Sequence, residues 1–594
     1  MRKIFILDTG VNRDRIGKFT VNSYVCDGKG VLPEINTNND PLGHGTGIVG
    51  CMKYSKDIEI NMIKIFKDDY ICQCNYLISA LEFICTLSDV YLVHMSLGVR
   101  RHEERLRVLC DYLHNKGVLL VAAYDNANVM SYPASYECVI GVQPSYRCSK
   151  TTDFVYVNNS PINIKAKPGK QIITDEPNGL RKTIQMGSSF AAAYVTAEIL
   201  KHNSFSCKED VLKHFQSIAV YEYNFAIEKS KLKPFEIKRA AIFPYNKENT
   251  SLIKYFDMLD FDIIHVFDIK YSGRVGDKIK CENEVEFTIE DISQCKWDDF
   301  DTIILGHVEE LSILTKKDLQ YEIIEKCLEY GINLYAYDNF GMEKHIDMFR
   351  QRGLDIFFPQ KFDKKESNKF GLLYQHKTPI IAVVGTSKKQ GKFTLQIQLR
   401  KILKEINVVG QLGTEPNSFL FNFDDMFTFG YASSIDAPIQ LVLEEINEKM
   451  HEIDLKNKDI IITGSQSSFL PHNAFNCNLI DFNQNAFLYA TMPDGVILMC
   501  NPQDSINYIN RTIQVIEGMI QTKVFMLAIY PFYVESDHII NIKKRKLNSV
   551  EIEEVKTKFN NATGLPVIIT GEDTENSTIL HELQKYFSKE NYDV

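Results

Sequence analysis

Met186-Gly187-Ser188-Ser189-Phe190-Ala191-Ala192-Ala193-Tyr194-Val195 joins a Gly-Ser-Ser turn directly to a run of small apolar residues. The run predicts a helix whose positive N-terminal end carries the hydroxyl of Ser189. Two glycine-marked fragments lie far upstream, Asp8-Thr9-Gly10 and Gly43-His44-Gly45-Thr46-Gly47. A serine, a histidine and an aspartate, each in its own turn, are the residue types of a nucleophile, a general base and an orienting acid.

The first 225 residues alternate short apolar runs with segments of helical spacing. Strands are expected at 3–7, 58–66, 90–96 and 117–123, and helices at 76–86 and 103–115. This rhythm predicts an α/β fold, with a mostly parallel sheet between layers of helices. Asp8 directly follows the first strand, and α/β folds place their sites at such positions.

The order Asp8, His44, Ser189 is the order of the catalytic residues in subtilisin. Five stretches resemble the sequence blocks of the subtilase family of serine peptidases: Asp8-Thr9-Gly10-Val11, His44 to Gly50, Met95-Ser96-Leu97-Gly98, Val121-Ala122-Ala123 with Tyr132-Pro133-Ala134, and Gly187 to Ala191. The resemblance implies a subtilisin-like domain over residues 1–225, with Ser189 as nucleophile, His44 as base and Asp8 as the residue that orients the base. It also implies that Ser96, Leu97 and Gly98 bind the substrate.

The oxyanion region departs from the family pattern. Subtilases usually carry Asn after Ala-Ala-Gly, whereas this chain has Ala122-Ala123-Tyr124-Asp125 followed by Asn126. An ionised carboxylate cannot donate a hydrogen bond and would repel the developing oxyanion. Three explanations stay open: Asp125 is protonated in a buried site, Asn126 reaches in after a small loop shift, or the enzyme is slow or inactive. We favour a slow but active enzyme, because the triad is retained and backbone N–H donors remain.

Residues 226–236 are charged, end near Pro234 and lack periodicity, so we expect a linker there. A second α/β rhythm fills residues 237–375, with a helix expected at 317–330 that stops at Gly331. We expect a small Rossmann-like domain, but no GxGxxG follows its first strand, so a dinucleotide site is not supported. Asp338, Asn339 and His345 are candidates to face a ligand, although ordinary polar loop residues are the simpler interpretation.

Residues 376–594 open with an apolar strand that leads into Gly385-Thr386-Ser387-Lys388-Lys389-Gln390-Gly391-Lys392-Phe393-Thr394 and then a helix expected at 395–403. A glycine-framed loop between strand and helix presents backbone N–H groups to phosphate, with Lys392 as the point charge. The loop is one residue longer than the usual P-loop, and its hydroxyl follows Phe393 instead of Lys392. We expect a P-loop NTPase-like domain, with ATP and Mg²⁺ as candidate cofactors. The predicted phosphate-binding residues are Gly385, Thr386, Gly391, Lys392 and Thr394.

Residues from about 237 to 530 resemble a bacterial two-domain P-loop family that includes D-glutamate N-acetyltransferases. A related branch is labelled as peptide-maturation proteins of natural-product gene clusters. The matching stretches are the loop itself, Gly410 to Glu415, Ser434 to Pro438, and Ile462 to Ser467 with Pro471-His472. In that family an acid that helps to position Mg²⁺ stands where this chain has Thr463. Its loss leaves Glu415 or Asp436 as substitutes, or else a degenerate structural domain.

The composition argues against nucleic-acid binding, membrane insertion and a cysteine metal site. The 594 residues carry a formal net charge of −10 and no long Lys/Arg block, so nucleic acid is a poor partner. We interpret the Lys543-Lys544-Arg545-Lys546 cluster as a solvated turn. No stretch is apolar enough for a membrane span, and Asp8 lies so near the first residue that we expect neither signal peptide nor N-terminal propeptide. The fourteen cysteines include no CxxC pair, so we expect reduced thiols, no metal site and a cytoplasmic protein.

Together these patterns predict a subtilisin-like serine endopeptidase fused to a P-loop module. It would act on a peptide or protein and need no cofactor for proteolysis. The resemblance of the second half points to limited processing of a ribosomally made natural-product precursor. Two alternatives stay open: a nucleotide- or acyl-donor-dependent transferase whose protease-like half binds a peptide, and a non-catalytic maturation scaffold.

Overall fold

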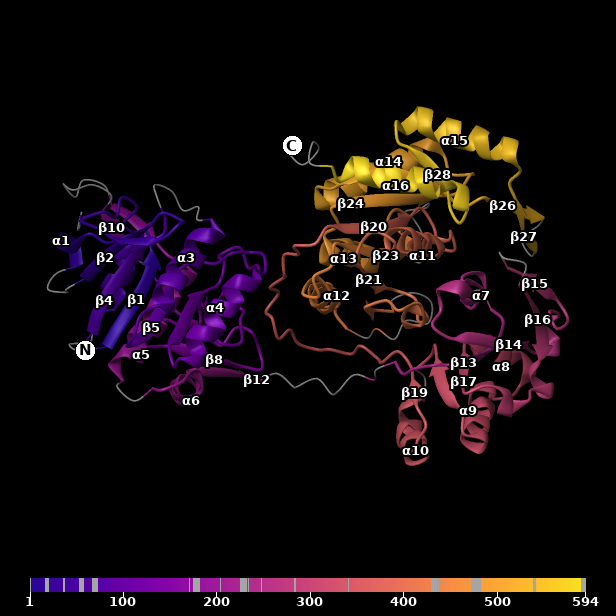
Figure 1. The fold of residues 1–594 in the computed structure, drawn as a ribbon, viewed down its shortest axis with the longest axis horizontal. Helices are drawn as coiled ribbons and strands as arrows, with labels where there is room; N and C mark the ends of the chain where they lie inside the picture. The colour runs from indigo at the N-terminus through magenta and orange to yellow at the C-terminus, as the bar shows by residue number, and fades with distance from the viewer. Residues whose placement is uncertain are drawn as a thin grey trace. The chain divides into compact units, whose positions relative to one another are not determined.

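The computed structural model divides into two units that interleave along the chain. The N-terminal unit holds Met1–Glu228 and Glu366–Lys377, and the C-terminal unit holds Lys229–Lys365 and Thr378–Val594. The α/β class is confirmed, because mostly parallel sheets are flanked by helices in both units (Figure 1). The structure describes residues 2–16, 21–35, 38–52, 58–66, 73–169, 171–174, 182–202, 205–224, 232, 234–246, 248–281, 285–339, 341–428, 435, 437–471, 482–537 and 541–588.

A ten-stranded sheet forms the centre of the N-terminal unit, in the order β12-β8-β9-β7-β6-β5-β1-β4-β2-β3. Its neighbouring strands are parallel except for the pairs β8–β9 and β2–β3. The strands are β1 (Arg2–Asp8), β2 (Val21–Cys26), β3 (Val31–Pro33), β4 (Ile58–Lys64), β5 (Val90–Met95), β6 (Leu119–Ala123), β7 (Ile140–Pro144), β8 (Phe154–Asn158), β9 (Ile164–Ala166) and β12 (Tyr221–Asn224). Strands β10 (Gln171–Thr174) and β11 (Lys182–Gln185) form a separate antiparallel pair.

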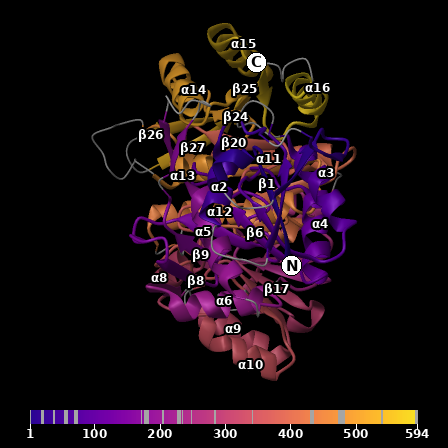
Figure 2. The same cartoon turned by 90° about the vertical axis from the view of Figure 1, so that its left-hand side faces the viewer.

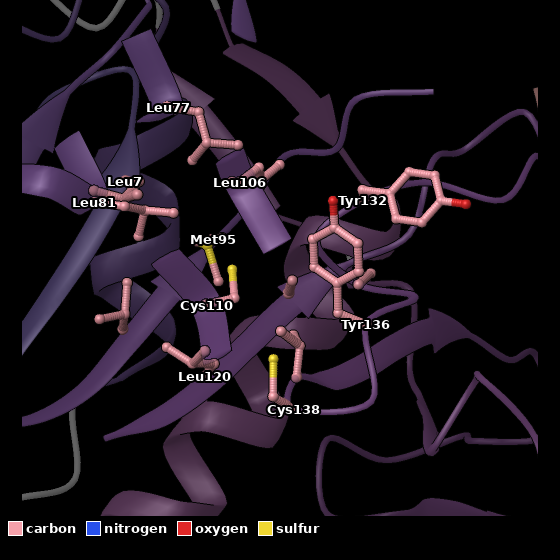
Figure 3. Close-up of a cluster of buried hydrophobic side chains, with 14 of the residues drawn as sticks. Leu7, Leu77, Leu81, Met95, Leu106, Cys110, Leu120, Tyr132, Tyr136 and Cys138 are labelled. Atoms are coloured by element: carbon pink, nitrogen blue, oxygen red, sulfur yellow. The ribbon is translucent and has the colours of Figure 1, made fainter. Parts of the chain in front are cut away.

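Successive residues of β1 enter two different cores, because side chains alternate between the faces of a strand. Phe5 and Leu7 pack with α3 (Cys74–Cys85) and α4 (Glu104–Asn115), and Figure 3 shows Leu7 in that cluster. Ile4 and Ile6 pack on the opposite face, with α2 (His44–Cys51), α5 (Ser188–Lys201) and α6 (Lys208–Ile218). Burial on both faces explains why the apolar run of this strand has no polar alternation.

The segment Glu366–Lys377, here called the returning segment, belongs to the N-terminal unit although 137 residues of the C-terminal unit (229–365) precede it. The backbone of Met130 donates to the carbonyl of Leu373 at 2.8 Å, and Arg101 pairs with Gln375 in a parallel bridge. Leu372 is 0% exposed and lies in the same core as Leu7. The returning segment therefore supplies part of the hydrophobic core beside the loop that follows β6.

Two seven-stranded sheets build the C-terminal unit. The first has the order β15-β16-β14-β13-β17-β18-β19, so the strand order reverses at β13. Its strands are β13 (Arg239–Phe243), β14 (Asp262–Asp268), β15 (Lys278–Lys280), β16 (Glu286–Asp291), β17 (Thr302–Leu305), β18 (Asn333–Ala336) and β19 (Ile356–Phe357), with helices α7 (Thr250–Lys254), α8 (Glu309–Thr315), α9 (Leu319–Tyr330) and α10 (Ile346–Gln351). Gly331 caps α9 with φ 72°, so the predicted stop is confirmed.

The second sheet has the order β22-β21-β23-β20-β24-β25-β28, with every neighbouring pair parallel. Helices α14, α15 and α16 lie near β24 and β28 in Figure 1 and near β24 and β25 in Figure 2. The strands are β20 (Ile380–Gly385), β21 (Val409–Gly413), β22 (Asp425–Met426), β23 (Ile460–Ser468), β24 (Gly495–Cys500), β25 (Lys523–Ile529) and β28 (Val567–Ile569). The helices are α11 (Lys392–Leu403), α12 (Ile439–Asp454), α13 (Phe482–Thr491), α14 (Ile506–Ile520), α15 (Ser549–Thr563) and α16 (Asn576–Tyr586).

Some details differ from the expectations. The basic cluster at 543–546 lies in β27 (Asn541–Lys546), which pairs with β26 (Phe532–Asp537), so the interpretation as a turn was wrong. Arg545 is held by Glu551, whose carboxylate also belongs to the capping box of α15. Most of the predicted linker at 226–236 lies outside the described residues. The cysteines that the structure describes form no disulfide. No helix in the described part of the chain has the length and apolar character needed to cross a bilayer.

Replacing Leu372 tests the place of the returning segment. Leu372→Ala leaves a cavity in the core of the N-terminal unit, and we expect a loss of about 2–5 kcal/mol in the stability of that unit. Hydrogen exchange of the Met130 amide, which donates to Leu373, measures this opening. Leu314→Ala is the matched control, because Leu314 is 73% exposed on α8. Equal protection of Met130 in both variants would contradict the packing of Leu372 described above.

Candidate active site

The predicted catalytic and substrate-binding residues lie at one edge of the ten-stranded sheet. Strands β6, β5 and β1 are neighbours in that order and run parallel. Asp8 ends β1, Ser96 to Gly98 follow β5, and Asp125 and Asn126 follow β6. Parallel strands bring their carboxyl ends to the same edge, which is the usual position of a site in an open α/β sheet. Helices α2 and α5 add His44 and Ser189 from their first turns.

Asp8 and His44 form a buried hydrogen-bonded pair. Asp8 is 0% exposed, and its Oδ1 lies 2.7 Å from His44 Nδ1 and accepts from the Thr9 amide at 2.7 Å. Burial raises the pKa of Asp8, but the charge and hydrogen bond of His44 outweigh it, so the pKa is lowered overall. Burial lowers the pKa of His44, yet Asp8 raises it to above the ordinary value. Asp8 thus stabilises the protonated form of His44, and His44 stabilises the ionised form of Asp8.

Asp40 fixes the loop that presents His44. Its carboxylate accepts from the Thr9 hydroxyl at 2.7 Å and from the Thr46 amide at 2.8 Å. A side chain at Gly45 would place its Cβ 2.2 Å from the carbonyl oxygen of Gly10, so only glycine allows this approach. The sequence analysis did not identify Asp40, because its role depends on its contacts with Thr9 and Thr46 in the folded chain.

Ser189 lies in the first turn of α5, and the next residue, Phe190, contacts the ring of His44. The His44 ring packs edge-on against Phe190, with centroids 5.4 Å apart. In this structure Ser189 Oγ donates to the carbonyl oxygen of Ser96 at 3.1 Å. Gly187 has φ 145°, and a Cβ there would lie 2.7 Å from Asn126 Oδ1. Glycine at 187 therefore lets the turn before Ser189 approach the loop that follows β6.

The structure separates the two residues of the predicted oxyanion region. Asp125 accepts from Arg100 Nε at 2.9 Å and from the Ala127 amide at 2.7 Å. Asn126 Oδ1 instead accepts from the amide and the hydroxyl of Ser188, both at 2.9 Å. These bonds assign the oxygen and nitrogen of the Asn126 carboxamide, because its oxygen must be the atom that faces the Ser188 amide. Asn126 therefore lies against the turn that carries Ser189.

His94 is a buried polar residue that sequence reasoning missed. It lies in the apolar strand β5, where a histidine is itself a signal, and it is 0% exposed. Its Nδ1 lies 2.8 Å from Thr196 Oγ1, and its Nε2 lies 2.7 Å from Ser96 Oγ. Burial lowers the pKa of His94 to about 4, so the ring is neutral near pH 7. His94 ties β5 and Ser96 to the helix that carries Ser189.

The phosphate-loop residues adopt a strand-loop-helix arrangement. The helix α11 begins at Lys392, three residues earlier than expected, with Gly391 as its N-cap at φ 78°. Lys392 Nζ donates to the carbonyl of Ser387 at 2.7 Å, while Gln390 Oε1 accepts from the Ser387 amide at 2.9 Å. Thr394 lies within the first turn of the helix. The carboxamide of Gln390 thus uses one of the backbone donors that a phosphate would need.

The groups near this loop fit phosphate better than they fit Mg²⁺. In P-loops a hydroxyl after the lysine binds Mg²⁺, whereas here Phe393 occupies that position. Thr463 is 0% exposed and its hydroxyl donates to the carbonyl of Leu412 at 3.3 Å. Thr386 Oγ1 donates to Asp504 at 2.5 Å, so a carboxylate does lie beside the loop. The proposed substitute Asp436, like His472, lies outside the described residues.

A second polar cluster lies at the carboxyl ends of the first sheet of the C-terminal unit. His307 follows β17 and its Nδ1 lies 2.6 Å from Oδ1 of Asp338, which follows β18. Burial lowers the pKa of His307, but Asp338, Glu248 and Glu415 raise it overall. The cluster lies next to β13, the switch point of the sheet, where α/β folds bind ligands. His345, in contrast, is buried within a 3₁₀ turn.

Known proteins are similar to parts of this chain. A family model described as a domain of unknown function, the P-loop domain of DUF1611, matches residues 364–576, so the predicted P-loop domain is confirmed. The crystal structure of a DUF1611 family protein from Anabaena variabilis is 15% identical, covers 59% of this chain and 99% of its own, and has a TM-score of 0.43. A cold-adapted subtilisin-like serine proteinase is 18% identical, covers 36% of this chain and 81% of its own, and has a TM-score of 0.30. No curated protein matches the chain.

The Asp8–His44 pair predicts a specific titration. The imidazole of His44 should titrate at a pH above 6.5, because the carboxylate of Asp8 stabilises its protonated form. Asp8→Asn removes that charge, so the titration midpoint should fall. NMR of histidine-labelled protein measures both midpoints, and His44→Gln identifies the resonance. A midpoint that does not move in Asp8→Asn would show that the two side chains are not coupled in solution.

Proposed function

We propose that the N-terminal unit is a subtilisin-like serine endopeptidase with Asp8, His44 and Ser189 as its triad. The observation that carries the proposal is the 2.7 Å hydrogen bond between buried Asp8 and His44, at the sheet edge where α5 begins with Ser188 and Ser189. Three residue types needed for activated nucleophilic attack, far apart in the sequence, belong to elements that meet there. The class of reaction is hydrolysis of a peptide bond.

In the proposed reaction, Ser189 Oγ attacks the scissile carbonyl carbon while His44 Nε2 takes its proton. Asp8 holds His44 Nδ1 and stabilises the imidazolium, which then protonates the leaving amine. Water hydrolyses the resulting ester of Ser189 by the same route and returns the serine. The Ser189 hydroxyl must first leave the carbonyl of Ser96, to which it donates in this structure. A peptide N–H that binds Ser96 would compete for that carbonyl and release the hydroxyl towards His44.

Asn126 is the proposed side-chain donor to the oxyanion. Its oxygen is occupied by Ser188, so its Nδ2 remains to face the tetrahedral intermediate. The Ser189 backbone amide is the second proposed donor. Asp125 is turned to Arg100 and to its own loop, which removes the charge repulsion that the sequence led us to expect. This arrangement favours the second of the three explanations, in which Asn126 reaches into the site.

The substrate of the proposed enzyme is a peptide or protein. We propose limited processing of a ribosomally made peptide in the cytoplasm, on the basis of the resemblance of residues 237 to 530 to maturation proteins. ATP and Mg²⁺ are candidate ligands of the C-terminal unit, and proteolysis itself needs neither. Phe393 and Thr463 stand where related proteins have residues that help to bind Mg²⁺. This difference favours phosphate binding over nucleotide hydrolysis in the C-terminal unit.

A transferase activity of the C-terminal unit is the second candidate, and one observation favours it. Helix α7 has Asn249 as its N-cap and ends at Lys254. Asn249 accepts from Tyr337, next to Asp338, while Lys254 Nζ donates to Gly571, which faces Thr394 of the phosphate loop. Five helical residues span about 8 Å. Contacts through α7 thus connect the His307–Asp338 pair with the residues around the phosphate loop, and the transferase proposal rests on this connection.

A fluorophosphonate probe tests the proposed nucleophile. Ser189 should be labelled, and His44→Ala should slow labelling by roughly 10³-fold or more, because the hydroxyl then has no base. His114→Ala, a histidine on α4 of the same unit, is the matched control and should label normally. Absence of labelling in the wild-type chain, combined with nucleotide binding that is lost in Lys392→Ala, would favour the transferase instead.

Substitutions at 125 and 126 test the proposed oxyanion donor. Asn126→Asp keeps an oxygen for Ser188 but removes the Nδ2 donor, so we expect kcat to fall by about 10²–10³-fold. Asp125→Asn removes only the partly exposed contact with Arg100, and we expect a change of less than about tenfold. Peptide hydrolysis by purified variants gives both values. A large gain in kcat in Asp125→Asn would instead place Asp125 in the oxyanion hole.

A further inference from the structure

Three side chains with metal-binding atoms converge at the end of α5 that is distant from Ser189. Glu198 lies in the last turns of α5, His202 is the C-cap of that helix, and His214 lies on α6. Their ligand atoms all lie within 4.8 Å of one another. We infer that Glu198, His202 and His214 form a binding site for a divalent transition-metal ion of the Zn²⁺ type.

The distances at this cluster are those of metal ligands. Oε1 of Glu198 lies 3.4 Å from Nε2 of His202 and 3.4 Å from Nε2 of His214. Direct N–H···O hydrogen bonds are usually 2.7–3.2 Å long. Ligands bound to Zn²⁺ at 2.0–2.1 Å in tetrahedral geometry are about 3.3 Å apart. Two of the three distances between ligand atoms therefore match a Zn²⁺ tetrahedron, and the third is within 4.8 Å.

The carboxylate and one imidazole are held in place by neighbouring groups. Lys201 Nζ binds Oε2 of Glu198 at 2.7 Å, which directs Oε1 towards the histidines. Arg2 donates to the carbonyls of Leu200 at 2.9 Å and His202 at 2.6 Å, and so fixes the end of α5. Lys201 is thus a partner in the second coordination shell that orients the carboxylate.

The second imidazole is positioned by the packing of α6. Lys208 at the start of α6 is anchored to the carbonyls of Glu137 and Val139 at 2.7 and 2.8 Å. The ring of Phe205 lies 5.3 Å from the rings of both His202 and His214. The site is therefore assembled before an ion binds.

The ligand chemistry selects the kind of ion. Two imidazoles and one carboxylate suit Zn²⁺, Co²⁺ or Ni²⁺, whereas Ca²⁺ and Mg²⁺ prefer oxygen-only sets. Side-chain exposures of 12% at Glu198, 39% at His202 and 17% at His214 leave an open fourth position for water. The ion would join α5, which carries Ser189 at its other end, to α6. Its role is to brace the nucleophile helix, and it takes no part in the reaction proposed for the triad.

Metal titration of the full-length, chelator-treated chain tests the site. Zn²⁺ alone should raise the melting temperature of the N-terminal unit, and Co²⁺ alone should give the visible spectrum of a low-symmetry site without thiolate charge-transfer bands. His214→Gln and, separately, Glu198→Gln should each abolish the Co²⁺ spectrum and the thermal shift. His114→Gln is the matched control and should keep both. Two independent ligand variants keep the test valid if one of them folds poorly, as judged by circular dichroism.

Some outcomes overturn the inference. Binding of Zn²⁺ and Co²⁺ that is unchanged in both ligand variants places the metal elsewhere in the chain. Thiolate bands in the Co²⁺ spectrum assign the ion to cysteines. Equal loss in His114→Gln shows that the effect is not specific to the cluster. Fluorophosphonate labelling of Ser189 is measured in parallel, so failure of the metal site remains distinguishable from failure of the proposed peptidase.

Discussion

A fully buried carboxylate is the constraint on which the N-terminal site depends. Removing Asp8 from water is costly unless its charge is compensated, and the Thr9 amide and His44 provide that compensation. The lowered pKa of Asp8 stabilises the fold above its unfolded value near 3.8, and this contribution is lost as pH falls through the folded value. The raised pKa of His44 contributes stability below about 6.5 that is lost as pH rises through its folded value. The Asp8–His44 pair therefore contributes both to the stability of the fold and to the proposed reaction. Position 45 must be glycine because the two residues approach each other so closely.

The sequence predicts correctly those elements that depend on local patterns of residues. The apolar runs of β1 and β20 and the stop at Gly331 follow from periodicity and backbone preference, and the structure confirms them. The placement of Asp8, His44 and Ser189 at one edge is expected from the resemblance to subtilases, while their catalytic roles stay predictions. The choice between Asp125 and Asn126 could not be made from sequence, because it depends on which of two adjacent side chains meets Ser188. The core position of Leu372 depends on contacts with residues more than 200 positions away.

In both units polar residues lie at the carboxyl ends of parallel strands, but their hydrogen-bond partners differ. At the N-terminal edge, Asp8 and His94 bond residues on other elements, as His94 does with Thr196. In the phosphate loop, Gln390 and Lys392 instead bind the loop's own backbone at Ser387. A ligand there must displace side chains that already satisfy the loop, which lowers its affinity relative to an empty cradle. The C-terminal unit also contains the hydrogen-bonded pair His307 and Asp338, whose residue types occur in catalytic sites.

The returning segment also imposes an order on biosynthesis. The core of the N-terminal unit lacks Leu372 until the ribosome has added about 150 residues beyond Glu228. At 5–20 residues per second this takes roughly 10–30 s. During that time the strands and helices around Asp8 and His44 exist without the last piece of their core, while the first sheet of the C-terminal unit is already being made. Completion of the core of the N-terminal unit is thereby coupled to synthesis of the first sheet of the C-terminal unit.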